Sequence, residues 1–441
     1  MPFEVKIPFP FRPLLPLVNK ELAKCIRCGE CRCVCPVFQE TFSERHTARG
    51  RLQILEALAK GLLEPTASVR EAIDNCLLCA KCADVCENKV NLAKAVLAAR
   101  EIFAQNMGMP LSKKLLSAVL SQPSPLLRTE AKFALWLQYL MCKKNPEHGG
   151  LHLRYATALM DRGQYLPQIA DVPFTAGYSK RIHNKRERVI FFAGCLINFA
   201  MRAVADSLVI IFDALGIDVL APSAQVCCGM PMVACGDVGA LARQAEKNEK
   251  ALADSDTVKI ITACASCGHM LKYLYPEMLR AHTIHARVRK MADRTVDAAE
   301  YLVHDIGISR LREIVKSPIN DFVTWHDPCH LSPGQSRAAP RLLLELATGG
   351  NVKEMNAPDA CCGFGGSYCF GNMSLSKKIQ ARKITDAVQT GTTTIGTACP
   401  GCMVQLADGL GRQNVPAMRV RHVLEILACT VAGSRQLSNA V

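Results

Sequence analysis

From about residue 188 onward, short apolar runs alternate with longer stretches that repeat apolar residues at helical spacing. The apolar runs predict buried strands at residues 189–192, 219–220, 260–262, 322–325 and 393–395. The helical stretches between them cover residues 202–215, 239–253 and 339–347. Short strands that alternate with helices are typical of parallel sheets, so we expect α/β architecture here.

The first part of the chain has helical patterns instead. Residues 51–60 repeat Leu at helical spacing before Gly61, and residues 91–106 do so before Gly108. Residues 1–20 are proline-rich and apolar, which predicts either a docked, extended arm or a disordered tail. We therefore expect four segments: a mostly helical domain with an N-terminal arm at 1–110, a basic helical linker at 111–187, and two α/β domains at 188–316 and 317–441.

Composition indicates the cellular compartment and the kind of partner to expect. It has 441 residues, 23 of them Cys, and a formal net charge of +14. The cysteines stand in tight C-x-x-C groups and no signal-peptide pattern opens the chain, so we expect a reducing cytoplasm with thiolates on metal. A basic chain suggests a nucleic-acid partner, but no aromatic-plus-arginine motif supports one. We therefore expect no nucleic-acid binding.

Membrane insertion is not expected from the sequence. The longest apolar candidate, residues 131–142, is too short to span a bilayer and contains Lys132. Any association with the inner face of a membrane would therefore be peripheral and would go through partners.

Two four-cysteine motifs lie within the first hundred residues. Both have the spacing C-x-x-C-x-x-C-x-x-x-C, which is typical of bacterial two-cluster ferredoxins. In that arrangement the fourth cysteine of each motif binds the cluster of the other motif. One [4Fe–4S] cluster is then expected on Cys25, Cys28, Cys31 and Cys86, and the other on Cys76, Cys79, Cys82 and Cys35. Zinc ribbons are the alternative, although this spacing suits tetrahedral zinc poorly.

Two residues depart from the simple motif. Glu87 stands where a proline usually follows the last cysteine, and Cys33 is an extra cysteine that we interpret as a structural thiol.

The second half of the chain contains a repeated cysteine pattern. Five cysteines recur at one period with a single one-residue slip (329 − 195, 361 − 227 and 362 − 228 are each 134; 399 − 264 and 402 − 267 are each 135). A repeat of this kind indicates tandem duplication. The first set is Cys195, Cys227, Cys228, Cys264 and Cys267, and the second is Cys329, Cys361, Cys362, Cys399 and Cys402.

Four of these cysteines directly follow predicted strands, so the thiols should gather at the carboxyl edge of each sheet. Five thiols with an adjacent pair suit an opened iron–sulfur cluster, since neighbouring cysteines cannot easily bind one iron. Zinc held by four of the five, a vicinal disulfide, or inert buried thiols are the alternatives. His326 and His330 flank Cys329 and are candidate proton donors or groups that orient the ligands.

The repeated pattern C-x31-C-C-G-x34/35-C-x-x-C resembles the CCG domain of heterodisulfide reductases. Two ferredoxin motifs followed by two such domains resemble the iron–sulfur subunit of glycolate oxidase and related D-lactate dehydrogenases, and residues 49–52 (RGRL) resemble a segment of that family. The resemblance implies two [4Fe–4S] clusters in the N-terminal domain and one or two further, non-cubane clusters in the CCG domains.

The resemblance implies an electron-transfer subunit of a flavin-dependent glycolate or D-lactate dehydrogenase. Its partners would be an FAD-containing dehydrogenase subunit and a quinone or a membrane redox protein. No G-x-G-x-x-G motif opens a helix after a strand, so we expect no flavin on this chain. The layout is equally compatible with a heterodisulfide-reductase-like catalytic subunit that reduces a disulfide within a respiratory membrane complex.

Overall fold

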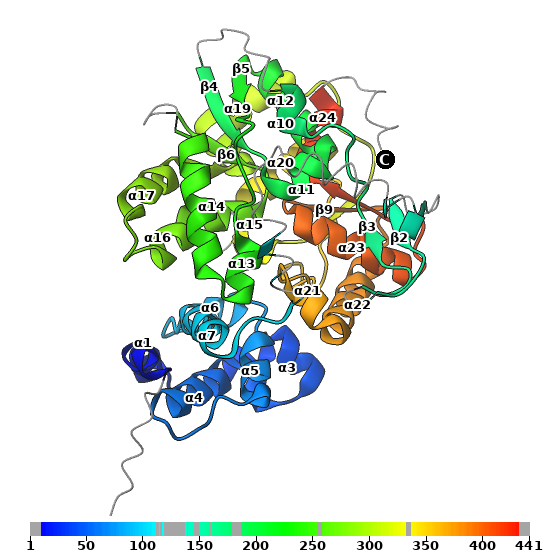
Figure 1. Cartoon of the computed structure of the whole chain (residues 1–441). Coiled ribbons are helices and arrows are strands. Elements are labelled where there is room, and N and C mark those ends of the chain that lie inside the picture. Colours follow the sequence, from blue (N-terminus) through cyan, green and yellow to red (C-terminus); the bar gives the residue numbers. More distant parts are fainter. Residues whose placement is uncertain are drawn as a thin grey trace, which may run out of the picture.

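The computed structural model describes residues 10–111, 114, 117–118, 137–138, 140–144, 150–157, 160–178, 187–253, 258–331 and 337–431. A helical N-terminal domain lies beneath two α/β units, as Figure 1 shows with the domain in blue. The expected fold class, a mostly helical first domain followed by α/β units with parallel sheets, is confirmed.

The N-terminal domain is built from helices around one apolar core. Thr47 caps α4 by accepting a hydrogen bond from the Gly50 amide, and Asn91 caps α7 in the same way. The elements are η1 (Arg12–Leu14), α1 (Leu15–Lys24), α2 (Glu30–Cys33), α3 (Pro36–Thr41), η2 (Glu44–His46), α4 (Ala48–Ala59), α5 (Ala67–Asp74), α6 (Lys81–Asp84) and α7 (Leu92–Met107).

The described part of the N-terminal arm is helical and docks on its own domain. The Phe11 ring is buried and lies 4.6 Å from the Phe103 ring between centroids. Pro13 and Pro16 are compatible with helix here because each falls within the first two positions of η1 or α1. The first nine residues of the arm lie outside the described residues.

The two α/β units have equivalent sheets. The first orders its parallel strands β5-β4-β6-β7 and the second β10-β9-β8, and a parallel bridge between Val323 and Val352 extends the second sheet beyond β8. The expected strands are all present, whereas β7 and β10 were not expected. The strands are β4 (Glu187–Phe192), β5 (Ile217–Leu220), β6 (Ile260–Thr262), β7 (Thr295–Asp297), β8 (Val323–Trp325), β9 (Thr394–Thr397) and β10 (Arg419–His422).

Helices cover both sheets, and one hydrophobic core runs through both units. The C-terminal helix α24 packs on α12 of the first unit, which ties the units together (Figure 1). The helices of the first unit are α11 (Gly194–Phe199), α12 (Arg202–Ala214), α13 (Met230–Cys235), α14 (Val238–Ala251), α15 (Ala265–His269), η3 (Met270–Leu274), α16 (Tyr275–Met278), α17 (His285–Arg294), α18 (Ala298–Glu300), η4 (Tyr301–Gly307) and α19 (Ile308–Ile314). Those of the second are η5 (Cys329–Leu331), α20 (Ala338–Thr348), α21 (Tyr368–Gly371), α22 (Met373–Gln389), α23 (Pro400–Arg412) and α24 (Val423–Val431).

The segment expected as a helical linker differs from that expectation in its described part. It contains a small antiparallel sheet of β1 (Cys142–Lys144), β2 (Leu151–Leu153) and β3 (Tyr165–Leu166), followed by α10 (Phe174–Tyr178). Strands of two or three residues are too short to show a period in the sequence. Most of the apolar stretch 131–142 lies outside the described residues.

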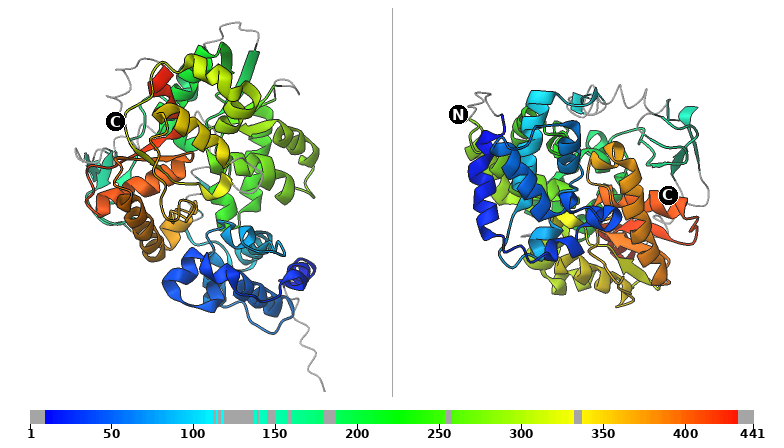
Figure 2. Two further views of the ribbon diagram at one scale, coloured as in Figure 1. Left: turned by 180° about the vertical axis from the view of Figure 1, so that it is seen from behind. Right: turned by 90° about the horizontal axis from the view of Figure 1, so that it is seen from below.

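The N-terminal domain docks against both units. The Arg100 side chain of α7 donates to the Ala234 carbonyl of α13, and Arg337 pairs with Asp84 at 2.7 Å. Lys81 forms a further ion pair with Asp359 of the second unit. From below, the N-terminal domain overlies parts of both units (Figure 2).

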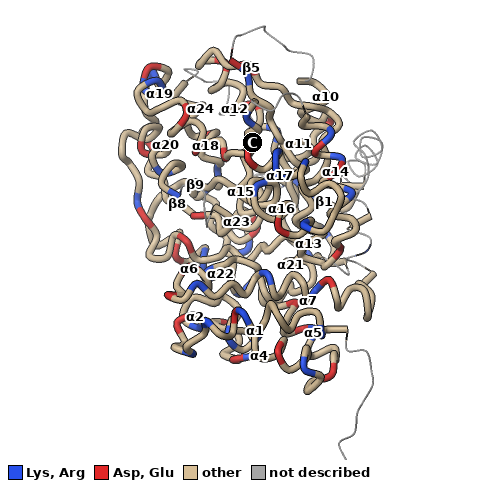
Figure 3. The backbone as a smooth tube through the Cα atoms, turned by 90° about the vertical axis from the view of Figure 1, so that its left-hand side faces the viewer, with Lys and Arg blue, Asp and Glu red and all other residues tan. Residues whose placement is uncertain are grey.

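Charge is mixed on the face drawn in Figure 3, where Lys and Arg alternate with Asp and Glu over the N-terminal helices. Within the described part of the chain, no helix has the length and apolar character needed to cross a membrane.

Candidate metal centres

The second four-cysteine motif gathers its thiols as the spacing predicts. Cys82 interacts electrostatically with Cys76 and Cys79, and Cys35 of the first motif interacts with all three. The loop bends tightly because Leu78 and Ala80 adopt left-handed backbone, with φ of 56° and 58°. Burial raises the pKa of the Cys82 thiol well above its ordinary value.

The first motif is more open. Cys25 and Cys31 interact, and both pack with Cys86 against the core of the domain, while Cys28 is exposed. Cys33 is also exposed, so the structural role in packing that we expected for it is wrong.

The first α/β unit brings its five cysteines together at one sheet edge. Cys195 follows β4 and Cys264 follows β6, as predicted from the apolar runs. Direct thiol contacts link the five in the order Cys195, Cys227, Cys228, Cys267 and Cys264. Hydrogen bonds from Cys227 and Cys267 lower the pKa of Cys228 to about 5, which favours a thiolate at the centre of the set.

The second unit repeats this arrangement. Cys361 contacts Cys329 and Cys362, and the Cys362 sulfur lies 3.5 Å from that of Cys402, which in turn contacts Cys399. Hydrogen bonds with Cys361 and Cys402 hold the pKa of Cys362 well below its ordinary value. Hydrogen bonds with Cys264 and Cys402 do the same for the pKa of Cys399.

Two further thiol contacts join these sets into one line. Cys79 of the N-terminal domain contacts Cys361 of the second unit, and this contact is the largest cause that lowers the pKa of Cys79 to about 7. Cys399 of the second unit contacts Cys264 of the first. Thiols therefore run without interruption from the N-terminal domain through the second unit to the first.

This donor chemistry fits iron–sulfur clusters. Convergent thiolates are the ligands that such clusters use, and each α/β set offers five of them. In the N-terminal domain the four-cysteine set with Cys35 has the composition of a [4Fe–4S] site. A small cavity of about 40 Å³ lies where the second set converges, and it is lined by Cys329, Cys361, Cys362, Cys399 and Cys402.

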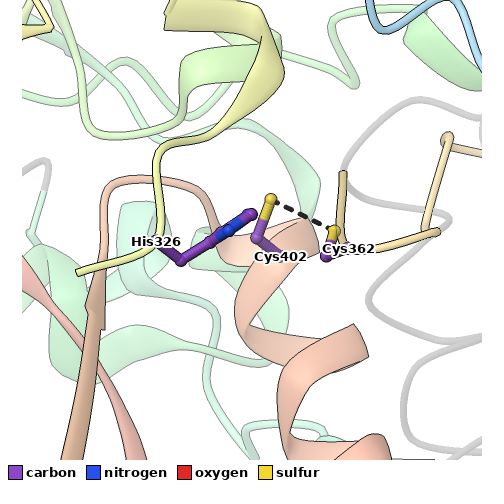
Figure 4. Close-up of side chains that lie close together, drawn as sticks. All are labelled: His326, Cys362 and Cys402. Carbon is purple, nitrogen blue, oxygen red and sulfur yellow. Dashed lines mark hydrogen bonds between the residues drawn. The ribbon is translucent and has the colours of Figure 1, made fainter. Parts of the chain in front are cut away.

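His326 lies beside the second set. One of its ring nitrogens and the Cys362 and Cys402 sulfurs all lie within 4.8 Å of one another, and Figure 4 shows the ring directed at the two thiols. His326 is fully buried, and a hydrogen bond from its ring helps to hold the pKa of Cys362 below its ordinary value. In the first unit the equivalent position, 326 − 134, is Phe192.

We expect His326→Phe, which copies the first unit, to lower the midpoint potential of the second-unit centre by tens of millivolts. A ring N–H directed at sulfur stabilises the reduced, more negative state, and one hydrogen bond is worth about 1 kcal/mol. A redox titration followed by electron paramagnetic resonance measures the shift.

Thr324→Val is the matched control, because Thr324 is likewise buried on the strand β8 that precedes His326, and its hydroxyl has no hydrogen-bond partner among the described residues. Equal potentials for the parent protein and His326→Phe, with iron content unchanged, would contradict the role of the imidazole.

His330 belongs to a second polar group, which sequence reasoning found only in part. The Ser266 hydroxyl lies 2.8 Å from His330 Nδ1 and 3.5 Å from the Cys399 sulfur. The His269 ring stacks on His330 with centroids 5.2 Å apart and planes 7° apart. Burial lowers the pKa of His269 to about 3, so this imidazole is neutral at ordinary pH.

Ser266 and His269 could have been found by comparing the two halves of the repeat. Position 266 + 135 is Gly401, and position 269 + 135 is Val404. The first unit therefore has polar side chains where the second has none. A comparison of the halves residue by residue would have singled out both positions.

Comparisons with known proteins agree with the domain layout. Residues 21–90 match the model of the 4Fe-4S dicluster domain, and residues 189–272 and 323–407 each match the model of the cysteine-rich CCG domain. This chain is an iron–sulfur protein with two CCG domains. Each CCG match falls on one of the two α/β units described above.

Several proteins are similar to most of this chain and align over most of their own length. The chain is 28% identical over 425 residues to the probable glycolate oxidase iron-sulfur subunit of Bacillus subtilis, covering 92% of this chain and 93% of that protein. It is 26% identical to one subunit of the fumarate reductase (CoM/CoB) of Methanothermobacter marburgensis, covering 93% and 72%. It is 25% identical to one subunit of the dihydromethanophenazine:CoB–CoM heterodisulfide reductase of Methanosarcina barkeri, covering 88% and 89%.

Proposed function

We propose that this CCG protein is the electron-transfer subunit of a flavin-dependent 2-hydroxy-acid dehydrogenase that acts on glycolate or D-lactate. Two [4Fe–4S] clusters in the N-terminal domain and one or two further clusters on the CCG domains would supply one-electron carriers. The FAD would reside on a partner dehydrogenase subunit. The complex would work in the cytoplasm, held at the inner face of the membrane by its partners.

The continuous line of thiols is the observation that supports this proposal most directly. Cys79 contacts Cys361, and Cys399 contacts Cys264, so the thiols of the second ferredoxin motif adjoin those of the second unit, which adjoin those of the first. An electron carrier needs such closely spaced centres, whereas a zinc scaffold has no use for contacts between sets. The similarity to the probable glycolate oxidase subunit covers 92% of the chain and favours the same class of partner.

Disulfide reduction at a CCG-bound centre is the second candidate. It is favoured by the complete pairs Cys264/Cys267 and Cys399/Cys402, which are brought into direct contact at the junction of the units. A substrate sulfur would need access to this junction. The two candidates differ in the partner that they require and in the acceptor that receives the electrons.

The test mixes the anaerobically purified full chain with its co-purifying flavoprotein and adds glycolate or D-lactate. We expect the brown iron–sulfur absorption to bleach, because reduced clusters absorb less visible light. The flavoprotein alone should still reduce an artificial dye with the same hydroxy acid. Turnover of a disulfide with no bleaching by either hydroxy acid would replace this proposal with the reductase.

A further inference from the structure

A cavity of about 480 Å³ lies between α7 of the N-terminal domain and the segment α15–η3–α16 of the first unit. Its walls include the apolar side chains of Leu97, Leu274 and Met278. Lys94 is the only cationic side chain among the described lining residues, and it is paired with Glu277 at 3.0 Å. Both are partly exposed, so the paired charges adjoin solvent.

The cavity also reaches the stacked rings of His269 and His330. Ser266 connects His330 to the Cys399 sulfur through contacts of 2.8 and 3.5 Å. The backbone of Leu78, next to Cys79 in the N-terminal domain, hydrogen-bonds His330 from the other side. The cavity therefore adjoins both the second ferredoxin motif and the junction of the two α/β units.

The polar groups here are not a by-product of the repeated fold. Ser266 and His269 correspond to Gly401 and Val404 in the second unit, and His330 corresponds to Leu196 in the first (330 − 134). Each of these three polar residues therefore has a counterpart without a polar side chain in the other unit. The repeated fold does not require these polar residues, because one unit folds without each of them. We take this as an indication that they have a binding role.

The lining favours a neutral, flat ligand with an apolar body and a hydrogen-bond acceptor. An anionic thiol or disulfide would need cations, and the single lysine here is already paired with a carboxylate. The stacked imidazoles offer a flat surface, and His269 Nδ1 is buried without a partner in the described structure. In the tautomer that places the ring proton on Nδ1, a buried N–H without an acceptor is costly, and a ligand carbonyl there would gain affinity.

We propose that this cavity binds the ring of a quinone, which is the electron acceptor of the complex. The inference rests on the proposed function, in which reduced iron–sulfur centres supply electrons. The quinone would take two electrons, one at a time, and two protons from water at the cavity opening, and leave as the quinol. Each donating centre would be oxidised by one electron per transfer.

The test measures binding of a decyl-substituted benzoquinone to the full, cluster-containing chain by equilibrium dialysis. Ala98 lines the cavity, and Ala104 lies six residues further along α7 and is not among the residues that line it. Ala98→Trp fills the cavity and should weaken binding at least about tenfold, whereas Ala104→Trp should leave it unchanged. His269→Phe keeps a flat ring but removes the N–H, so we expect about fivefold weaker binding.

Absorption spectra and iron content of each variant show that the clusters stay intact. Equal affinity of Ala98→Trp and the parent protein would overturn the site, and so would an absence of quinone binding. Tighter binding of glutathione disulfide than of the quinone would overturn the ligand class. Reduction of the clusters through the flavoprotein is measured without quinone. That experiment therefore tests the proposed function independently of the quinone site.

Discussion

Replacing Cys361 with serine is expected to slow electron passage from the N-terminal domain into the α/β units at least about tenfold. Cys361 is the residue at which these regions meet, because it contacts Cys79 on one side and Cys329 and Cys362 on the other. Loss of groups that only orient metal ligands typically costs about 10–100-fold in affinity or activity. Loss of a thiolate at the junction should cost no less.

The measurement follows reoxidation of the pre-reduced full chain by a soluble acceptor dye in stopped flow. Cys369→Ser is the matched control, because Cys369 is a buried thiol of the same unit that lies outside the five-cysteine set. It should leave both the rate and the iron content unchanged. A rate for Cys361→Ser equal to that of Cys369→Ser would show that electrons do not cross at this contact.

The local patterns of the chain predicted the architecture of each region well. Apolar runs placed β4, β6, β8 and β9, and their ends placed four cysteines at the sheet edges. The ferredoxin spacing predicted that Cys35 joins the second motif. These features follow from a few neighbouring residues, so a single sequence is enough to find them.

The contacts between regions could not be predicted in this way. The meeting of Cys79 with Cys361 depends on how α7 docks on α13, and no period in the sequence encodes that docking. The contact that Arg100 makes across the domain boundary could not be predicted for the same reason. A buried arginine in an amphipathic helix looks the same in sequence as an exposed one, and only its partners distinguish the two.

Arg100→Met is expected to destabilise the chain strongly. The guanidinium is 4% exposed and donates to the backbone carbonyls of Ile73, Asp74, Cys76 and, across the domain boundary, Ala234. Removal leaves these carbonyls buried without their donor, and takes from Asp74 one of its two ion-pair partners, the one at 3.7 Å. Removing one partner of a buried charged group typically costs about 3–5 kcal/mol.

Arg70→Met is the matched control for this substitution. Arg70 also pairs with Asp74, at 3.5 Å, and donates to the Gly108 carbonyl at 2.8 Å, but its contacts stay within the N-terminal domain. Anaerobic thermal unfolding should therefore show a drop of several degrees for Arg100→Met and a smaller one for Arg70→Met. Equal shifts would mean that Arg100 contributes no more than an ordinary ion pair.

Gly236→Ala tests the same boundary from the other side. Gly236 has φ of 82°, and an added Cβ would overlap the carbonyl of Arg100, because the two backbones are in contact there. The substitution keeps the Arg100 side chain and its N–H donors, but the added methyl group pushes α13 away from α7. If docking through Arg100 sets the contact between Cys79 and Cys361, Gly236→Ala should slow transfer between the regions while iron content stays constant. Normal transfer in this variant, together with a lowered unfolding temperature, would separate the stability of the boundary from its role in electron transfer.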